Sequence, residues 1–343
     1  MKIGLVLSGG GAKGAYQAGL IAALAEHDIE IEMISGASIG ALNGALISAA
    51  GDISKAAERL DKLWDLVATK DVLGFNPELY PRYLSMLVAA GLTGVGQLGL
   101  GLLAGWAGNR ADTGFVDTSP LTDILDRYLC PQELSNGIPL HVSLYPYRGR
   151  LHAITEFIKG EVIKRFDTQQ SIFKHVQALS PEEQKEVLLA SAAIPVLFTP
   201  RKVGGQLFSD GGQGNYKSVQ GNTPITPLLG QGLDAIIVSH LEDGSLWDAD
   251  DFPDENIFEI RPSRRLAEKG ARDMLGFDAQ SISRWKAQGK DDATHLLDRL
   301  IKIAGSRAAL AQSTSSLQSK VNGHSDTLQS ESLELAMKKL GEE

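Results

Sequence analysis

Cysteine is scarce in this chain, and its scarcity limits the sites that the chain can contain. Cys130 is the single cysteine among 343 residues, so an intrachain disulfide and a cysteine-based metal cluster are excluded. A chain with so little cysteine fits a reducing compartment, and we expect a cytoplasmic protein. His, Asp and Glu residues are not grouped at metal-ligand spacing, so we expect no metal and no cofactor.

Long basic runs are also missing. The chain carries 33 Lys and Arg against 42 Asp and Glu, which gives a net charge of -9. This balance argues against nucleic acid as a partner. Hydrophobic residues make up 43% of the chain and charged residues 22%, which is typical of a globular protein.

The first residues lack the long apolar run of a signal peptide. Residues 3–7 are apolar, but the core of a signal peptide needs roughly 7–15 such residues. Glycines and Lys13 follow directly. We therefore expect this segment to be the first strand of the fold.

Residues 83–109 contain no charged side chain and are rich in glycine. A transmembrane helix needs about 20 apolar residues, which this stretch could supply. Each glycine, however, weakens a helix by roughly 1 kcal/mol relative to alanine. Three interpretations stay open: a lid or interfacial segment, a buried core element, and a membrane span.

The order of apolar segments indicates an α/β fold with a mainly parallel central sheet flanked by helices. Strands are expected at residues 2–7, 32–34, 140–145, 151–158, 235–239 and 257–260. Helices are expected at residues 15–26, 40–50, 53–68, 119–129, 181–194, 279–287, 293–304 and 331–340.

Residues 36–40 have the sequence GASIG, which fits the pattern G-x-S-x-G between a predicted strand and a predicted helix. A serine on such a sharp turn adopts a strained backbone conformation and exposes its hydroxyl at the helix N-terminus. The flanking Gly36 and Gly40 leave room for the neighbouring backbone. The pattern makes Ser38 a candidate nucleophile, although a plain small-residue turn would look similar.

Residues 9–14, GGGAKG, form a glycine loop after the first strand. The pattern G-x-G-x-x-G also occurs in dinucleotide-binding proteins, but those place an acid at the end of the second strand. Glu30 and Glu32 lie at the beginning of that strand instead. Glycine amides at a helix N-terminus can bind an anion, so the loop could hold an oxyanion. Lys13 could add charge toward a lipid phosphate.

Ser38 needs a base, and two kinds of residue compete for that role. Among seven histidines, His240 is the one that follows a predicted strand at a plausible end. Asp210, followed by Gly211 and Gly212 after a short apolar strand at residues 207–208, is the alternative, although Asp-Gly turns are common. The residues alone leave this choice open.

The three motifs together, in this order and spacing, closely resemble the patatin-like phospholipase family. The segment ASAAIP at residues 190–195 also resembles the end of a helix in that family. The resemblance covers residues 1–215 and implies a patatin-like three-layer α/β sandwich. It further implies a Ser–Asp dyad without histidine. The site residues that it implies are Ser38 as nucleophile, Asp210 as base, Gly9, Gly10 and Gly11 with Ile39 as oxyanion hole, and Gly14, Gly36, Gly40, Gly211 and Gly212 as motif glycines.

The resemblance implies a lipid acyl hydrolase, a phospholipase A or lysophospholipase, acting on glycerophospholipid esters. Lys13 stands where many family members have arginine. A general carboxylesterase, a neutral-lipid hydrolase and a ligand-activated effector that degrades membranes are alternatives; a dinucleotide-binding oxidoreductase belongs to another class. The expected partners are a lipid ester and a membrane surface contacted peripherally, with a homo-oligomer or a regulatory ligand as further options.

We expect two domains. Residues 1–262 would form the catalytic domain, with the apolar segment at about 74–112 inserted as a lid. Residues 263–343 would form a mostly helical C-terminal extension that packs on the catalytic domain or regulates it.

Overall fold

The computed structural model describes residues 1–69, 119–149, 167–194, 198–215, 217–242, 246–267, 276–302, 314 and 337. The apolar segment 83–109 and the expected strand 151–158 lie outside these residues. The chain divides into two compact units, Met1–Thr294 and His295–Glu343. The domain boundary near Pro262 stays a prediction.

One mixed sheet forms the centre of the first unit. Its strands, as far as the structure describes them, are β1 (Ile3–Leu7), β2 (Met33–Gly36), β3 (Leu140–Pro146), β4 (Ile172–His175), β5 (Arg201–Val203), β6 (Gln206–Asp210), β7 (Ala235–Ser239) and β8 (Ile257–Ile260). They are arranged in the order β5-β6-β3-β2-β1-β7-β8, and β4 pairs with β3. The pairs β1–β2, β1–β7, β2–β3 and β7–β8 are parallel, which confirms the expected mostly parallel sheet.

The antiparallel pairs lie on the other side of β3 and involve β4, β5 and β6. The sequence did not predict β4 and β5, which have four and three residues. Segments this short carry too few residues for a clear alternating pattern.

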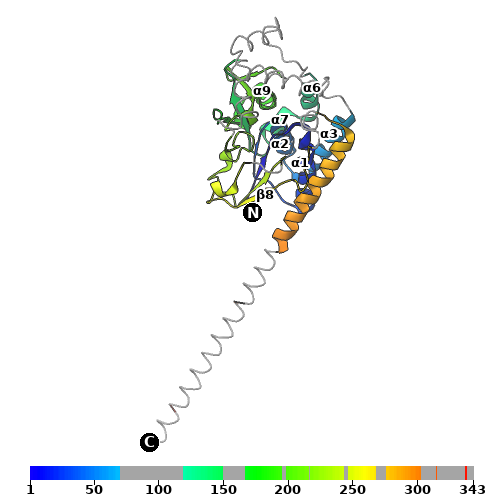
Figure 1. Ribbon diagram of the computed structural model, residues 1–343, viewed down its shortest axis with the longest axis vertical. Helices are drawn as coiled ribbons and strands as arrows, with labels where there is room; N and C mark the ends of the chain where they lie inside the picture. Colours follow the sequence, from blue (N-terminus) through cyan, green and yellow to red (C-terminus); the bar gives the residue numbers. More distant parts are fainter. Residues whose placement is uncertain are drawn as a thin grey trace, which may run out of the picture. The chain divides into compact units, whose positions relative to one another are not determined.

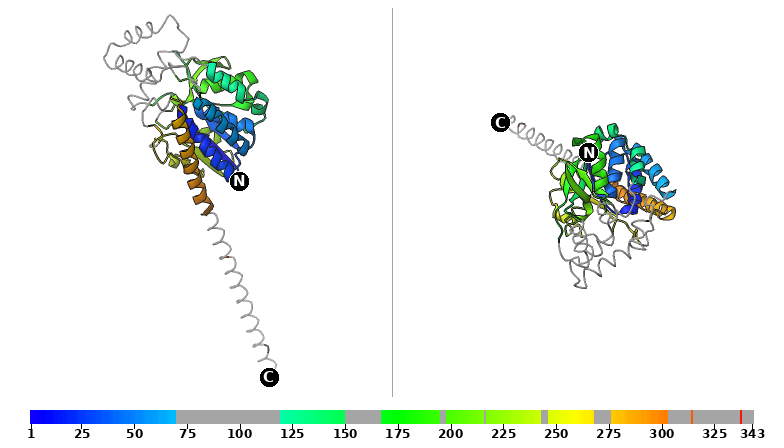
Figure 2. Two further views of the ribbon diagram at one scale, coloured as in Figure 1. Left: turned by 90° about the vertical axis from the view of Figure 1, so that its right-hand side faces the viewer. Right: turned by 90° about the horizontal axis from the view of Figure 1, so that it is seen from above.

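Helices flank the sheet, as expected (Figure 1). They are α1 (Ala15–Glu26), α2 (Ile39–Ala50), α3 (Ile53–Thr69), α6 (Ser119–Tyr128), α7 (Pro131–Ser135) and α9 (Pro181–Ser191). α3 packs against both α1 and α2, and Figure 2 shows the three helices side by side from two further directions. Short 3₁₀ turns are η1 (Gly11–Gly14), η3 (Val176–Ala178), η4 (Gly211–Gln213), η5 (Thr226–Leu228) and η6 (Ala249–Asp251).

Local chemistry explains where these helices begin and which face they bury. Pro181 occupies the first turn of α9, and the Ser180 hydroxyl accepts a hydrogen bond from the Glu183 amide, as an N-cap should. In α3 the apolar residues recur every three or four positions, so Leu60, Trp64 and Val67 are buried together.

The two faces of the sheet are packed differently. Leu7 of β1 points toward α2, where its side chain lies 3.7 Å from the position that a Cβ on Gly44 would take. Val6, next along β1, belongs to a buried cluster on the opposite face. That cluster contains Val6, Ile225, Leu228, Ile236, Val238 and Trp247.

A single helix spans residues 279–302, where the sequence predicted two helices separated near Gly289. That prediction was wrong because the glycine serves close packing. A Cβ on Gly289 would lie 1.9 Å from the Tyr16 carbonyl oxygen, and a Cβ on Gly19 would lie 1.9 Å from the Lys286 carbonyl oxygen. The part of this helix within the first unit therefore crosses α1 at backbone contact.

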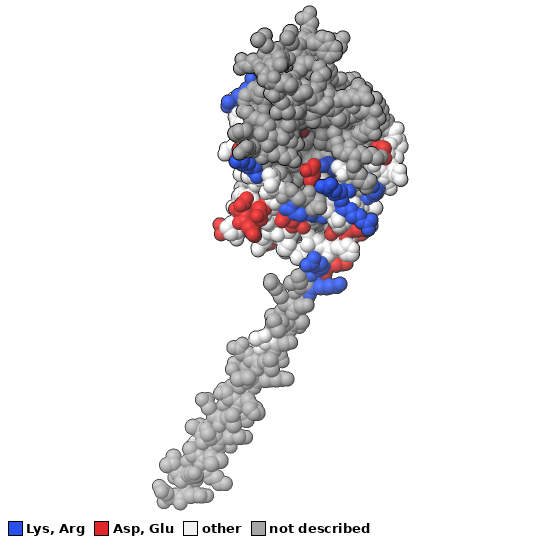
Figure 3. Space-filling model, in the orientation of Figure 1, with Lys and Arg blue, Asp and Glu red and all other residues white. Residues whose placement is uncertain are grey.

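Acidic and basic side chains are interspersed on the face of the molecule that Figure 3 shows, as far as the described residues cover it. Of the helices that the structure describes, none combines the length and the apolar composition needed to cross a membrane.

Candidate active site

Ser38 lies on a strained turn between β2 and α2. Its backbone angles are φ 52° and ψ -123°, a conformation that L-residues rarely adopt. A Cβ on Gly36 would lie 2.6 Å from the Gly40 carbonyl oxygen, and a Cβ on Gly40 would lie 2.2 Å from the Leu7 carbonyl oxygen. Both glycines are thus required by close backbone approach, as the motif predicted.

The turn is held by a hydroxyl that the sequence did not reveal. The Ser38 amide donates to the Ser191 hydroxyl at 2.9 Å, and that hydroxyl donates to the Ser143 carbonyl at 2.8 Å. Ser191 is fully buried at the end of α9. It therefore links the serine turn to β3.

Strand register brings Asp210 level with Ser38. Gly36 of β2 pairs with Val142 of β3, and Asp210 of β6 pairs with Leu144, two residues further along β3. Ser38 is likewise two residues beyond Gly36. The two side chains lie far apart in the sequence and meet because β2 and β6 both pair with β3.

The Asp210 carboxylate is buried and accepts two hydrogen bonds. One comes from the Gly212 amide at 2.8 Å, and the other comes from the Ser38 hydroxyl. Burial raises the pKa of Asp210 to about 6, and the two hydrogen bonds oppose that rise. Asp210 is thus a stronger base than an ordinary aspartate, yet it is still mostly ionised at neutral pH.

The glycine loop reaches the same place because β1 and β2 are parallel neighbours. A Cβ on Gly9 would lie 3.0 Å from the Ser38 Cβ, so Gly9 permits close approach. Its amide donates to the Asn222 carbonyl at 3.1 Å and is therefore engaged within the chain. Gly10 and Gly11 follow, and Gly11 lines the same pocket as Ser38.

Lys13 is buried under this loop. It forms an ion pair with Glu242 at 2.8 Å, and Glu242 is itself 72% exposed. A Cβ on Gly10 would lie 3.2 Å from the Lys13 Cε. The expected phosphate contact of Lys13 stays a prediction, while the ammonium group is paired with a carboxylate of the chain.

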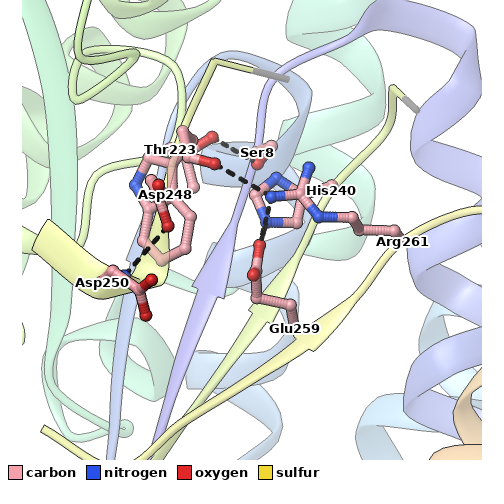
Figure 4. A network of polar contacts seen from close by, with 8 residues as sticks. Ser8, Thr223, His240, Asp248, Asp250, Glu259 and Arg261 are labelled. Atoms are coloured by element: carbon pink, nitrogen blue, oxygen red, sulfur yellow. Dashed lines mark hydrogen bonds and ion pairs between the residues drawn. The ribbon is translucent and has the colours of Figure 1, made fainter. Parts of the chain in front are cut away.

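His240 is engaged away from the serine turn. Its Nε2 atom lies 2.7 Å from a Glu259 carboxylate oxygen, which also forms an ion pair with Arg261 (Figure 4). The His240 ring packs against Trp247 at 5.3 Å between centroids. Burial lowers the pKa of His240, so the imidazole is neutral at pH 7. This arrangement favours Asp210 over His240 as the base.

An apolar pocket opens at Ser38. Its walls come from α2, α3, α6, the segment after α9, and Phe277, which lies two residues before the helix at residues 279–302, called the C-terminal helix from here on. The lining residues are Gly11, Ser38, Ile39, Leu42, Asn43, Leu46, Leu63, Trp64, Val67, Leu121, Ile124, Leu125, Tyr128, Ala192, Ile194, Phe198 and Phe277. Most of the lining side chains are apolar, which suits a hydrocarbon group.

Asn43 is the one amide side chain among the pocket residues, and it is satisfied within the chain. It donates to the Gly14 carbonyl at 3.0 Å and to Gln17 at 2.8 Å, and it accepts from Trp64 Nε1 at 3.2 Å. In the described part of the chain, no group of three or more His, Cys, Asp and Glu side chains could hold a metal ion.

A strained serine turn beside a buried carboxylate, on a mostly parallel sheet, is typical of the sites of serine acyl hydrolases with an α/β fold. The family model for patatin-like phospholipases matches residues 5–229. The chain belongs to this family.

The curated relatives are much longer proteins. Lysophospholipase nte1 of Aspergillus terreus is 46% identical over 69 residues, which cover 18% of this chain and 4% of that protein. Neuropathy target esterase sws of Drosophila willistoni is 42% identical over 79 residues, covering 23% of this chain and 5% of that protein. The matched segment is thus a small part of each relative.

The solved structures that match this chain are more distant in sequence. VipD from Legionella pneumophila is 16% identical with a TM-score of 0.40, covering 86% of this chain and 66% of that chain. ExoU from Pseudomonas aeruginosa, solved in complex with SpcU, is 15% identical with a TM-score of 0.36. That match covers 87% of this chain and 52% of ExoU.

Proposed function

We propose that this protein is a phospholipase A or lysophospholipase that cleaves the carboxylic esters of glycerophospholipids. The observation that carries the proposal is the apolar pocket that opens at Ser38. An acyl chain lying in this pocket would present its ester carbonyl to the Ser38 hydroxyl, which is hydrogen-bonded to Asp210. The matched relatives named as a lysophospholipase and an esterase support the same reaction class.

The proposed reaction has two steps. Asp210 accepts the hydroxyl proton as Ser38 Oγ attacks the ester carbonyl, and the resulting oxyanion receives hydrogen bonds from the amides of Gly10, Gly11 and Ile39. The C–O bond to the glycerol oxygen then breaks, and that oxygen leaves with the proton from Asp210. In the second step Asp210 deprotonates a water molecule, which attacks the acyl-serine. The bond between the acyl carbon and Ser38 Oγ then breaks, Oγ takes the proton back from Asp210, and the fatty acid is released.

The geometry supports Asp210 without a histidine. A base that shares a hydrogen bond with the nucleophile needs no intermediate group, and a pKa of about 6 brings the carboxylate closer to the serine in basicity. Esters have better leaving groups than amides, which suits a base that is still weak.

The pocket recognises an acyl chain, and the residues that the structure describes around it offer little to select a head group. A general carboxylesterase or a neutral-lipid hydrolase is therefore the second candidate. A substrate embedded in a bilayer would further require peripheral contact with the membrane, and we propose this contact as part of the function.

Fatty-acid release from phosphatidylcholine and lysophosphatidylcholine, compared with hydrolysis of soluble short-chain esters, tests the proposal. We expect wild type to release fatty acid and Ser38→Ala to lose about 10³-fold or more of that activity. Ser283→Ala, a serine exposed on the C-terminal helix, is the matched control and should retain it. Release that survives Ser38→Ala would contradict the proposal, and hydrolysis of soluble esters alone would favour the carboxylesterase.

A further inference from the structure

We propose that Phe277 is a specificity-determining residue that sets the length and bulk of the acyl chain accepted at Ser38. The inference rests on the proposed function and assigns part of its substrate site to a segment outside residues 5–229, which the family model matches. A residue outside the matched region would therefore complete the acyl pocket.

Phe277 and Trp64 form one aromatic wall of the pocket. Their rings stack with centroids 6.2 Å apart and planes inclined by 20°, and both residues line the pocket that contains Ser38. Trp64 is fixed on the inner side, because its Nε1 atom donates to Asn43 at 3.2 Å. A Cβ on Gly14 would lie 3.1 Å from the Trp64 ring, so that ring also abuts the glycine loop.

Phe277 is held against this wall by the helix that begins two residues later. Lys286 forms ion pairs with Asp61 and Asp65 of α3, the helix that carries Trp64. These contacts fix the start of the C-terminal helix along α3. Phe277 is thereby placed over the Trp64 ring.

The same helix is attached to α1, which follows the glycine loop. The Tyr16 hydroxyl donates to Asp292 at 2.9 Å, and Gly289 passes the Tyr16 carbonyl at backbone contact. Trp285 is fully buried, and its Nε1 atom donates to the Leu266 carbonyl at 2.9 Å. The position of Phe277 is therefore set by packing that is independent of the pocket.

A change in the size of this side chain should change which acyl chains fit. Truncation to alanine removes the ring and enlarges the pocket beside Trp64, while tryptophan fills more of it. When one methylene group of a substrate gains or loses its contact with an apolar pocket, the ratio of kcat/KM between the two substrates changes by about 10–200-fold. The effect should fall on the acyl part of the substrate because the wall carries no charge.

The test compares kcat/KM for lysophosphatidylcholines and p-nitrophenyl esters whose acyl chains run from four to sixteen carbons. Phe277→Ala should raise the ratio of long-chain to short-chain kcat/KM by about tenfold or more, and Phe277→Trp should lower it. Phe173→Ala, on the partly exposed strand β4 and outside the pocket lining, is the control and should leave the ratio unchanged. Thermal unfolding reports whether each variant folds, and Phe277→Leu replaces the alanine variant if that one does not.

A second measurement separates this inference from the proposed function. Binding of fluorescent fatty acids of different length to the Ser38→Ala variant, with and without the Phe277 substitutions, reports the pocket without turnover. The same shift in preferred length is expected. Ser38-dependent hydrolysis with an unchanged length profile in both Phe277 variants would overturn the role of Phe277 alone. Length-selective binding without any hydrolysis by wild type would overturn the proposed function and leave the pocket assignment standing.

Discussion

At the scale of single residues, the site depends on Asp210, which is buried. No cationic side chain is among the groups that shift its pKa. Burial raises that pKa, and only the Ser38 hydroxyl and the Gly212 amide counter it. A surface aspartate with a pKa near about 3.9 would be a much poorer base toward serine. The proposed chemistry therefore depends on the burial of Asp210, which raises its pKa.

This environment predicts a pH dependence. Because a raised pKa means that Asp210 holds a proton below about pH 6, kcat/KM for a soluble ester should fall about tenfold per pH unit below that value. Above pH 6 the carboxylate is ionised and the rate should level off. The measurement is a pH–rate profile from pH 4 to 9, with circular dichroism as a check on folding.

The control for this profile is His240→Gln, since the ordinary pKa of histidine lies close to the same range. His240 is hydrogen-bonded to Glu259, so the position of the acid limb should not move in this variant. Disappearance of the limb in His240→Gln, or a wild-type plateau that extends to pH 4, would contradict the role of Asp210.

Part of the site could be predicted from residues close together in the sequence. The G-x-S-x-G pattern located Ser38, and the structure confirms that Gly36 and Gly40 are required by backbone contacts. The support from Ser191 could not be predicted in this way, because its hydrogen bond to the Ser38 amide joins residues 153 positions apart. Nothing in the local pattern distinguishes Ser191 from an ordinary helical serine.

At the scale of elements, the contact between the C-terminal helix and α1 was not predicted from the sequence. The sequence predicted two helices, at residues 279–287 and 293–304, and Gly289 lies between them, where a glycine lowers helix propensity. Close packing overrides that preference, because only a residue without Cβ fits against the Tyr16 carbonyl. The strands β4 and β5 were not predicted for a different reason. Each is too short to show an alternating pattern, and each is stabilised by pairing with a neighbouring strand.

The crossing predicts the sign of the change in the free energy of unfolding when Gly289 is replaced by alanine. In an isolated helix Gly289→Ala would stabilise by about 1 kcal/mol. Here the added methyl group would meet backbone at 1.9 Å, so the free energy of unfolding should instead fall by about 1–3 kcal/mol. Urea or thermal unfolding measures the change.

Ser283→Ala provides the comparison, because Ser283 is exposed on the same helix. Its effect should lie within about 0.5 kcal/mol of zero. A Gly289→Ala variant as stable as wild type, or more stable, would show that the helix does not cross α1 in the way described.

At the scale of the whole molecule, strand order explains how distant motifs converge. β1 and β2 are parallel neighbours, which brings the glycine loop next to Ser38, and the antiparallel pairing of β6 with β3 delivers Asp210 to the same level. The mostly parallel sheet was predicted from the order of elements. The position of Phe277 beside the Ser38 pocket was not predicted, because the residues from 263 onward carry no motif that links them to the site.

Direct chemical trapping of the nucleophile is the measurement that tests the central claim. A fluorophosphonate reacts with an activated serine, and mass spectrometry of the digested protein then locates the adduct. We predict one adduct per chain, on the peptide that contains Ser38, with none formed by Ser38→Ala and a much slower reaction of Asp210→Asn. An adduct on another residue, or Ser38 left unlabelled by an enzyme that still hydrolyses lipid esters, would contradict the Ser38–Asp210 mechanism.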